Sequence, residues 1–291
     1  MTTQQPRILV TGASGQLGRL VIDHLLKIVP ATRIVAAMRD PAGGAALAAQ
    51  GVTVVPADYS KPETLDAAFA GIDRVLLISS NALGERVAQH RNAIDAAKRA
   101  GVKLLAYTSV LRADTSGLGL AEEHRQTEAA LRASGVPFVL LRNGWYNENY
   151  TASIPSALAH NALLGSAGDG RISSAARADY AAAAAAVLTS TEDQAGRIYE
   201  LAGDDAYTLS QFAAEVSKQA GKPLAYMNLP EADFKAALAG AGLPAPLAEL
   251  LANSDAAAAE GALFDDGNQL SRLIGRPTTP FAQTIAAAVA A

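Results

Sequence analysis

An apolar stretch that runs into three glycines, and then into a helical pattern, constrains the fold of this chain most. The segment is Ile8-Leu-Val-Thr-Gly12-Ala-Ser-Gly15-Gln-Leu-Gly18. In such a unit the first glycine permits a tight turn, the second lets the main chain approach a pyrophosphate, and the third lets the helix pack against the sheet. The helix start offers free N–H groups and a positive dipole end to an anion. The segment therefore predicts a dinucleotide-binding turn. We assign to it Thr11, Gly12, Ser14, Gly15, Gln16, Leu17 and Gly18.

The first half of the chain alternates short apolar runs with amphipathic stretches. The expected strands are Arg7–Val10, Arg33–Met38, Val52–Pro56, Arg74–Ile78, Lys103–Thr108 and Pro137–Leu141. The expected helices are Gln16–Ile28, Ala42–Ala49, Pro62–Ala70, Glu85–Ala100 and Leu120–Ser134. Runs that are apolar on consecutive positions are typical of strands covered on both faces. The alternation predicts an α/β fold with a Rossmann-type, doubly wound parallel sheet.

The regular alternation of strands and helices ends at about Trp145, and after it we expect helices with scattered short strands. Thr208-Leu-Ser-Gln211 matches a capping box and predicts a helix to Ala220. Further helices are expected from Asp179 and over Pro230–Ala239, and a strand over Arg197–Leu201. We therefore expect an NADPH-binding Rossmann domain over 1–150. A smaller lobe over 151–291 covers the substrate, with a soft boundary because it contributes strands to the main sheet.

The tip of the second predicted strand indicates which nicotinamide cofactor binds. An acidic residue there would bind the ribose 2′-hydroxyl of NAD, whereas an arginine accommodates the 2′-phosphate of NADP. Arg39 stands nearest that tip and favours NADPH. In the competing interpretation, Asp40 takes the ribose and Arg39 is a solvated surface charge. Asp58, after the third strand, is placed to meet the adenine, or else it caps a helix or shapes a turn.

Polar residues follow the later predicted strands, at the edge where a doubly wound sheet binds its ligand. Small polar groups that can reach the ribose or carboxamide are Ser79, Ser80, Asn81 and Thr108. The segment Arg142–Tyr150 is rich in amide and aromatic groups, which can cover the nicotinamide and stack on a flat acceptor. The candidates for lining the reaction site are Tyr107, Asn143 and Trp145. The alternative for Trp145 and Tyr146 is packing between the lobes.

A missing motif restricts the reaction. Short-chain dehydrogenases generally carry a Tyr-x-x-x-Lys pair after the fifth strand, and no lysine of this chain has a tyrosine four residues before it. His124 and Glu128 occupy the corresponding positions and could form a polar pair. Hydride transfer to a ketone needs a positioned acid, whereas a quinone leaves a phenolate-like anion that water protonates, since phenols have a pKa of about 10. The absence therefore favours quinones, extended enones or cationic dyes, and it equally fits a protein that binds the dinucleotide without turnover.

Composition excludes several other classes. The chain has no cysteine, so it has neither disulfides nor thiolate metal sites, which fits a reducing cytosol. Its four histidines are scattered and match no zinc pattern, so we expect no metal. With a net charge of −4 and no basic patch, nucleic acid is not an expected partner. There is no signal-peptide pattern and no apolar run long enough for a bilayer, so we expect a cytoplasmic protein. The sequence leaves the oligomeric state open, and a homodimer is possible.

Several further motifs carry a resemblance to a known family. They are Asp58-Tyr59, Leu76-Leu-Ile-Ser-Ser80, Ala106-Tyr-Thr-Ser109, Ala113-Asp-Thr-Ser116, Leu141-Arg-Asn-Gly-Trp-Tyr146, Arg177-Ala-Asp-Tyr180 and Leu273-Ile-Gly-Arg-Pro277. With the glycine turn, they make the chain resemble the NmrA-like, atypical short-chain dehydrogenases, and among these the bacterial NADPH-dependent quinone reductases. The resemblance extends from about Arg7 to beyond Pro280. It implies an NADPH-bound cleft, a quinone acceptor and no flavin, with Asn143 and its aromatic neighbours beside the nicotinamide and the quinone. Similar proteins reduce triphenylmethane dyes, and others sense the NADP redox state without turnover.

Overall fold

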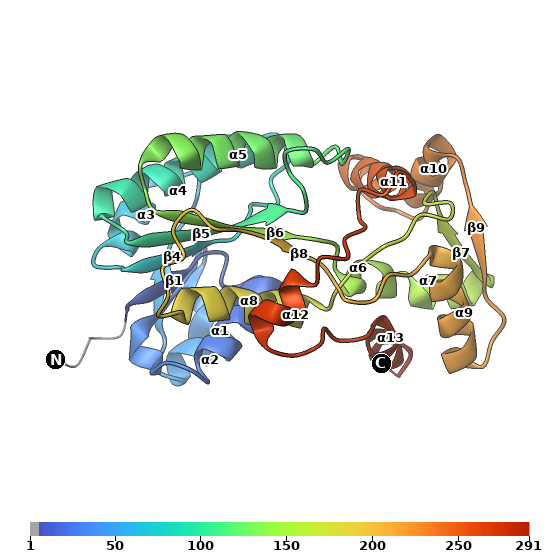
Figure 1. The fold of residues 1–291 in the computed structure, drawn as a ribbon, viewed down its shortest axis with the longest axis horizontal. Coiled ribbons are helices and arrows are strands. Elements are labelled where there is room, and N and C mark those ends of the chain that lie inside the picture. Colours follow the sequence, from blue (N-terminus) through green and yellow to red (C-terminus); the bar gives the residue numbers. More distant parts are fainter. Residues whose placement is uncertain (1–5, 291) are drawn as a thin grey trace. The chain divides into compact units, whose positions relative to one another are not determined.

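The computed structural model describes residues 6–290, which form two compact units (Figure 1). The chain passes between the units repeatedly. Within these residues, unit 1 takes 6–110, 123–142 and 180–199, and unit 2 takes 111–122, 143–179 and 200–290. The single boundary expected near residue 150 stays a prediction, because compactness alone does not show which stretch folds independently.

A seven-stranded parallel sheet in the order β3-β2-β1-β4-β5-β6-β8 forms the centre of the Rossmann-type fold. Its strands are β1 (Ile8–Val10), β2 (Ile34–Met38), β3 (Thr53–Pro56), β4 (Arg74–Leu77), β5 (Leu104–Val110), β6 (Phe138–Asn143) and β8 (Ile198–Leu201). The chain moves outward from β1 to β3 and then crosses back to β4. The carboxyl ends of β1 and β4 therefore meet at the switch point where such sheets bind ligands. The expected doubly wound parallel sheet is confirmed.

Helices lie on both faces of this sheet. They are α1 (Gln16–Leu25), α2 (Ala45–Ala49), α3 (Pro62–Phe69), α4 (Arg86–Ala100), α5 (Ala121–Ser134) and α8 (Arg177–Thr189), with short 3₁₀ turns at Ala31–Arg33 and Pro41–Gly44. In Figure 1, α3, α4 and α5 cover one face, and α1 and α8 cover the other. β1 and β2 consist of apolar residues, and β2 and β5 are buried at every position.

The predicted elements of the first half are all present, with small differences at their ends. The helix expected over Ala42–Ala49 is divided into a 3₁₀ turn and α2. The proline and glycines explain this: Pro41 starts the turn, and a Cβ at Gly44 would lie 2.7 Å from a methyl of Val54. Gly101 ends α4 in the left-handed conformation, with a φ of 66°.

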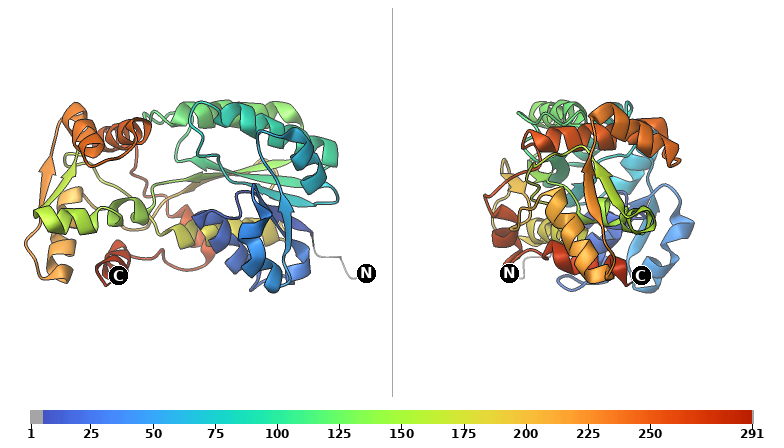
Figure 2. Two further views of the ribbon diagram at one scale, coloured as in Figure 1. Left: turned by 180° about the vertical axis from the view of Figure 1, so that it is seen from behind. Right: turned by 90° about the vertical axis from the view of Figure 1, so that its right-hand side faces the viewer.

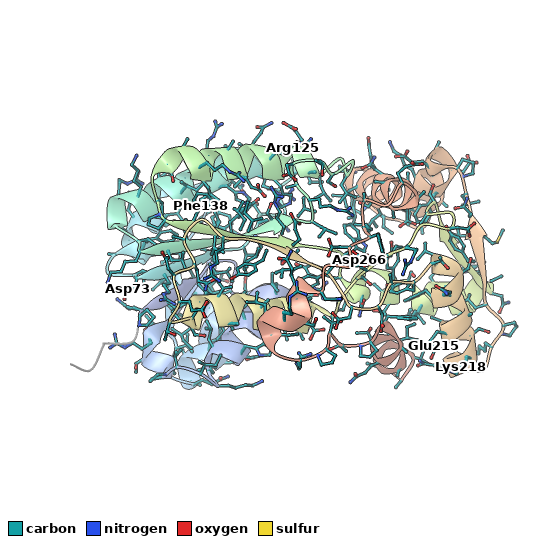
Figure 3. The ribbon with its side chains drawn as sticks, viewed as in Figure 1. Asp73, Arg125, Phe138, Glu215, Lys218 and Asp266 are labelled. Atoms are coloured by element: carbon teal, nitrogen blue, oxygen red, sulfur yellow. The ribbon has the colours of Figure 1, made fainter. Side chains whose placement is uncertain are left out.

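Asp73, which Figure 3 labels, links the amino ends of β1, β4 and β5. Its carboxylate accepts the Arg7 N–H at 2.8 Å and pairs with the Lys103 ammonium at 2.7 Å. Burial raises the pKa of Asp73, but these partners outweigh burial and the pKa is lowered below its ordinary value. These contacts at the amino ends of the strands are therefore structural, and we expect the functional site at the carboxyl ends.

Unit 2 is mainly helical and carries a two-stranded parallel sheet of β7 (Ala162–Gly165) and β9 (Ala225–Asn228). Its helices are α6 (Asn147–Thr151), α7 (Ile154–His160), α9 (Leu209–Ala220), α10 (Glu231–Gly240), α11 (Ala245–Ala259), α12 (Gln269–Ile274) and α13 (Phe281–Val289). Figure 2 shows α10 packed beside α11. The predicted capping box of Thr208 and Gln211 is present at the start of α9. The helix expected from Asp179 begins two residues earlier, at Arg177.

Asp179 anchors the C-terminal segment of unit 2. Its fully buried carboxylate accepts hydrogen bonds from the N–H and hydroxyl of Thr279 at 2.7 and 3.2 Å, and it pairs with Arg276 at 2.6 Å. Because a buried carboxylate must be compensated, this segment is an integral part of the unit.

Candidate functional site

The glycine turn connects β1 to α1 as the sequence predicts. Gly12 has a φ of 58°, the left-handed region that favours glycine. A Cβ on Gly18 would lie 2.5 Å from the Gly12 carbonyl oxygen and 2.8 Å from the Cα of Ala13, so the helix can approach the turn only because residue 18 has no side chain. Gly15 is the N-cap of α1, and neither a side-chain cap nor an acidic residue occupies its first turn. The first N–H groups of α1 are thus uncapped and lie at the positively polarised end of the helix, a geometry that suits an anion.

Thr11 and Tyr59 fix the turn from behind. The Thr11 hydroxyl donates to the Leu76 carbonyl at 2.9 Å and accepts the Ile78 N–H at 3.0 Å, which ties β1 to the end of β4. The Tyr59 hydroxyl bonds to Thr11 and to the Ile78 carbonyl. Thr11 is buried and its hydroxyl is used within the protein, so a cofactor contact of Thr11 stays a prediction. Sequence reasoning gave Tyr59 no role, although the Asp58-Tyr59 motif marked it.

Arg39 and Asp40 stand at the end of β2 and behave differently. The Asp40 carboxylate accepts the Ala42 N–H at 3.0 Å and caps the following 3₁₀ turn. Arg39 is exposed and makes no hydrogen bond or ion pair with any residue from 6 to 290. An unpaired guanidinium at this strand tip fits the 2′-phosphate of NADP. Asp58 shapes a turn by accepting the Ser60 N–H at 2.9 Å, and the N-cap of α3 is Lys61. The adenine contact of Asp58 stays a prediction.

A buried hydrogen-bond chain holds the residues after β4. The Ser80 N–H donates to Nε2 of His90 at 2.9 Å, so His90 must carry its proton on Nδ1, which lies 3.0 Å from the Thr127 hydroxyl. Burial lowers the pKa of His90 to about 3, which keeps the ring neutral. The Ser79 N–H donates to the Thr108 hydroxyl at 2.8 Å. Ser80 and Thr108 are buried, Ser79 is half-buried and Asn81 is exposed.

In short-chain dehydrogenases helix α5 carries the Tyr-x-x-x-Lys pair, whereas here its polar side chains bind partners inside the core. His124 and Glu128 do not pair with each other. The His124 Nδ1 lies 2.7 Å from the Tyr107 hydroxyl, and Glu128 forms a buried ion pair with Arg142 at 2.7 Å and accepts the Ser109 hydroxyl. Tyr107 is fully buried, so an acceptor could reach it only if the core opened. A contact of Tyr107 with the acceptor therefore stays a prediction.

The loop after β6 belongs to unit 2. Asn143 is buried, and its Oδ1 has no hydrogen-bond partner among residues 6–290. A buried acceptor without a partner is costly, and a ligand N–H such as that of a carboxamide would satisfy it.

The residues after Asn143 are held firmly in place. The guanidinium carbon of Arg177 lies over the Tyr146 ring, 4.6 Å from the centroid of that ring. Burial raises the pKa of Tyr146, so this phenol stays protonated at neutral pH. The Glu148 carboxylate accepts the Arg177 N–H, and main-chain bonds join Trp145 and Asn147 to Ala175. Sequence reasoning missed Arg177 as a support of this loop.

Residues 6–290 contain no cluster of three or more His, Cys, Asp or Glu side chains suited to a metal ion. None of their helices combines the length and apolar character that a membrane span requires.

Comparison with known proteins agrees with this geometry. Residues 4–280 match the NmrA-like family. Quinone oxidoreductase 2 of Escherichia coli (strain K12) is 58% identical over 278 residues, covering 96% of this chain and 97% of that protein. The crystal structure of an NADPH-dependent quinone oxidoreductase from Escherichia coli, complexed with NADPH, superposes with a TM-score of 0.94 at 57% identity, over 96% of this chain and 99% of that one.

A second solved structure indicates the breadth of the family. The triphenylmethane reductase of a Citrobacter species superposes with a TM-score of 0.92 at 36% identity, over 98% of this chain and 99% of that one. Since the family match and the identity both extend over nearly the whole sequence, the chain belongs to the NmrA-like family.

Proposed function

We propose that this protein is a flavin-independent NADPH:quinone oxidoreductase that reduces a quinone to a hydroquinone in one two-electron step. The observation that carries the proposal is an Arg39 guanidinium without a partner among residues 6–290, together with an uncapped glycine turn, in a chain 58% identical to an Escherichia coli quinone oxidoreductase. NADPH, when bound, supplies a hydride to the quinone, and one proton from water completes the hydroquinone while NADP⁺ remains.

The residues that follow β1 and β2 bind the phosphate groups of the cofactor in this proposal. The N–H groups at the start of α1 bind the pyrophosphate, and the closeness of Gly18 to Gly12 keeps that helix end beside the turn. Arg39 binds the 2′-phosphate through charge-assisted hydrogen bonds. The free Oδ1 of Asn143 accepts an N–H of the carboxamide, which orients the nicotinamide.

The chain supplies position rather than an acid to the chemical step. It lacks the Tyr-x-x-x-Lys pair, and Tyr107 and Glu128 are committed to the core. A hydroquinone anion needs no strong acid, because its phenol-like pKa is about 10. The residues therefore have to hold two flat rings together and limit water, which can supply much of a rate enhancement. We propose that the protein performs this reaction in the cytoplasm.

The test is an acceptor screen with purified protein, following the loss of NADPH absorbance. We expect sustained turnover with simple benzoquinones and naphthoquinones and no bound flavin in the visible spectrum. We also expect a primary isotope effect with NADPH deuterated at C4, and little reduction of cytochrome c, because a two-electron step releases no semiquinone.

An NADP sensor without turnover is the rival function. Saturable NADP binding with no oxidation across a panel of quinones and cationic dyes would contradict the proposal and favour the sensor. Dye reduction far more efficient than quinone reduction would instead assign the activity named for the Citrobacter relative.

A further inference from the structure

Unit 2 contains a cavity of about 330 Å³ that the fold does not fill. Its wall comes from the loop after β6 and from α6, α7, β7, α10 and α11. The side chains that matter here are Trp145, Tyr150, Leu163, Phe234, Leu238 and Asp255. The volume lies at the lower end of the range for small-molecule pockets, which suits one or two fused rings.

Asp255 is the one carboxylate among the residues that line this mainly apolar cavity. Asp255 on α11 is 5% exposed, and its carboxylate accepts the Tyr150 hydroxyl at 3.1 Å and the Ser166 N–H at 3.0 Å. No lysine or arginine among residues 6–290 forms an ion pair with it. Burial raises its pKa to about 6, so the carboxyl is ionised at pH 8 and gives the cavity a negative potential.

Trp145 connects the cavity to the proposed reaction. It lines the cavity and stands two residues after Asn143, which we assign to the nicotinamide. A planar ring that enters this cavity would thus contact the same loop that positions the cofactor.

We propose that the cavity receives the ring of the electron acceptor, and that Asp255 makes it select neutral or cationic rings over anionic ones. The inference rests on the proposed quinone reduction for the identity of the ring. Its physical basis is that an anionic substituent would be brought close to a second negative charge in surroundings of low polarity, where repulsion is poorly screened.

The binding test uses the only tryptophan of the chain as its reporter. Protein saturated with NADP⁺, which cannot turn over, is titrated at about pH 8 with 1,4-naphthoquinone and with its 2-sulfonate, and Trp145 emission is followed. The chain has no cysteine, so thiol addition to the quinone cannot interfere. We expect saturable quenching by the neutral quinone and binding of the sulfonate at least about tenfold weaker.

Asp255→Asn tests the charge directly, because asparagine keeps an oxygen for Tyr150 or Ser166. We expect the preference for the neutral quinone to fall severalfold through tighter binding of the sulfonate. Asp233→Asn, an equal change of charge on the exposed surface of α10, should leave the preference unchanged. Equal ratios in wild type and Asp255→Asn would overturn the charge selection. Thermal unfolding of each variant shows that it is folded.

A second pair of variants tests the cavity itself. Ala237→Phe fills it from α10, and Ala236→Phe adds the same ring to the exposed face of that helix. We expect Ala237→Phe to bind naphthoquinone at least tenfold more weakly than the wild type, as measured by quenching of Trp145. Ala236→Phe should bind it as tightly as the wild type does. Unchanged binding in Ala237→Phe would place the ring elsewhere.

The two proposals fail in different ways. Sustained NADPH oxidation that is indifferent to Ala237→Phe and Asp255→Asn would leave the quinone reductase function intact and overturn the cavity assignment. Selective quenching of Trp145 without any NADPH oxidation would support the cavity as a ring site and overturn the function.

Discussion

Replacing Gly18 with alanine tests how closely α1 must approach the glycine turn. The new Cβ would lie 2.5 Å from the Gly12 carbonyl oxygen and 2.8 Å from the Cα of Ala13. Both neighbours are main-chain atoms, so the helix or the turn has to move by roughly half an ångström or more. Overpacking of this kind costs about 1–3 kcal/mol. For a chain of this length that corresponds to a Tm lowered by about 2–5 °C. We also expect NADPH to bind roughly tenfold or more weakly, because the shifted N–H groups no longer converge on the pyrophosphate.

The assay pairs thermal unfolding with NADPH titration by fluorescence. Gly43→Ala is the matched control, since its Cβ would meet no heavy atom within 4 Å and its φ is not positive. It should change Tm by little and leave NADPH binding unchanged. If Gly18→Ala were as stable as the control and bound NADPH equally well, the close approach of helix and turn would not be what builds the site.

Three further predictions concern charge and protonation. Arg39→Ala should raise the KM for NADPH about 10- to 100-fold and leave that for NADH unchanged; equal effects on both would contradict the 2′-phosphate contact. Glu128→Ala should lower the unfolding free energy by about 3–5 kcal/mol, because the buried Arg142 guanidinium loses the carboxylate with which it pairs at 2.7 Å, whereas the exposed Glu63→Ala should cost less than about 1 kcal/mol in the same urea titration. The folded pKa of His90 is about 3, below its unfolded value of 6.5, so its contribution is complete above pH 6.5 and is lost as the pH falls toward 3. Between pH 7.5 and 5 the wild type should therefore lose about 2 kcal/mol more than His90→Gln, and identical losses would show that His90 is protonated without cost.

The sheet and its cofactor turn could be predicted from the sequence because their signals are local. Consecutive apolar residues in β2 and β5 mark strands covered on both faces, and the glycine spacing at residues 12, 15 and 18 follows from main-chain sterics. The position of Arg39 at a strand end could be predicted as well, because Arg39 directly follows the second apolar run.

Side-chain partners could not be predicted in the same way. Tyr107 was expected at the reaction site from its place near a strand end, but it is buried in the core and its hydroxyl lies beside Nδ1 of His124, which α5 supplies. Asp255 lies in an alanine-rich helix, where a polar residue is a weak signal, and its importance depends on Tyr150, more than 100 residues away. The strands β7 and β9 are only four residues long and partly exposed, so they lack a clear pattern.

The way the two units share the chain has a consequence for synthesis on the ribosome. Unit 1 takes its last segment from residues 180–199, so roughly two thirds of the polypeptide must emerge before this unit can be completed. By then the first two segments of unit 2 have also emerged, but unit 2 cannot be completed until residues 200–290 have been synthesised. Neither unit can be cut out as one continuous gene fragment. Changes of substrate preference in such a protein should therefore arise by substitution within the helices of unit 2 rather than by exchange of whole domains.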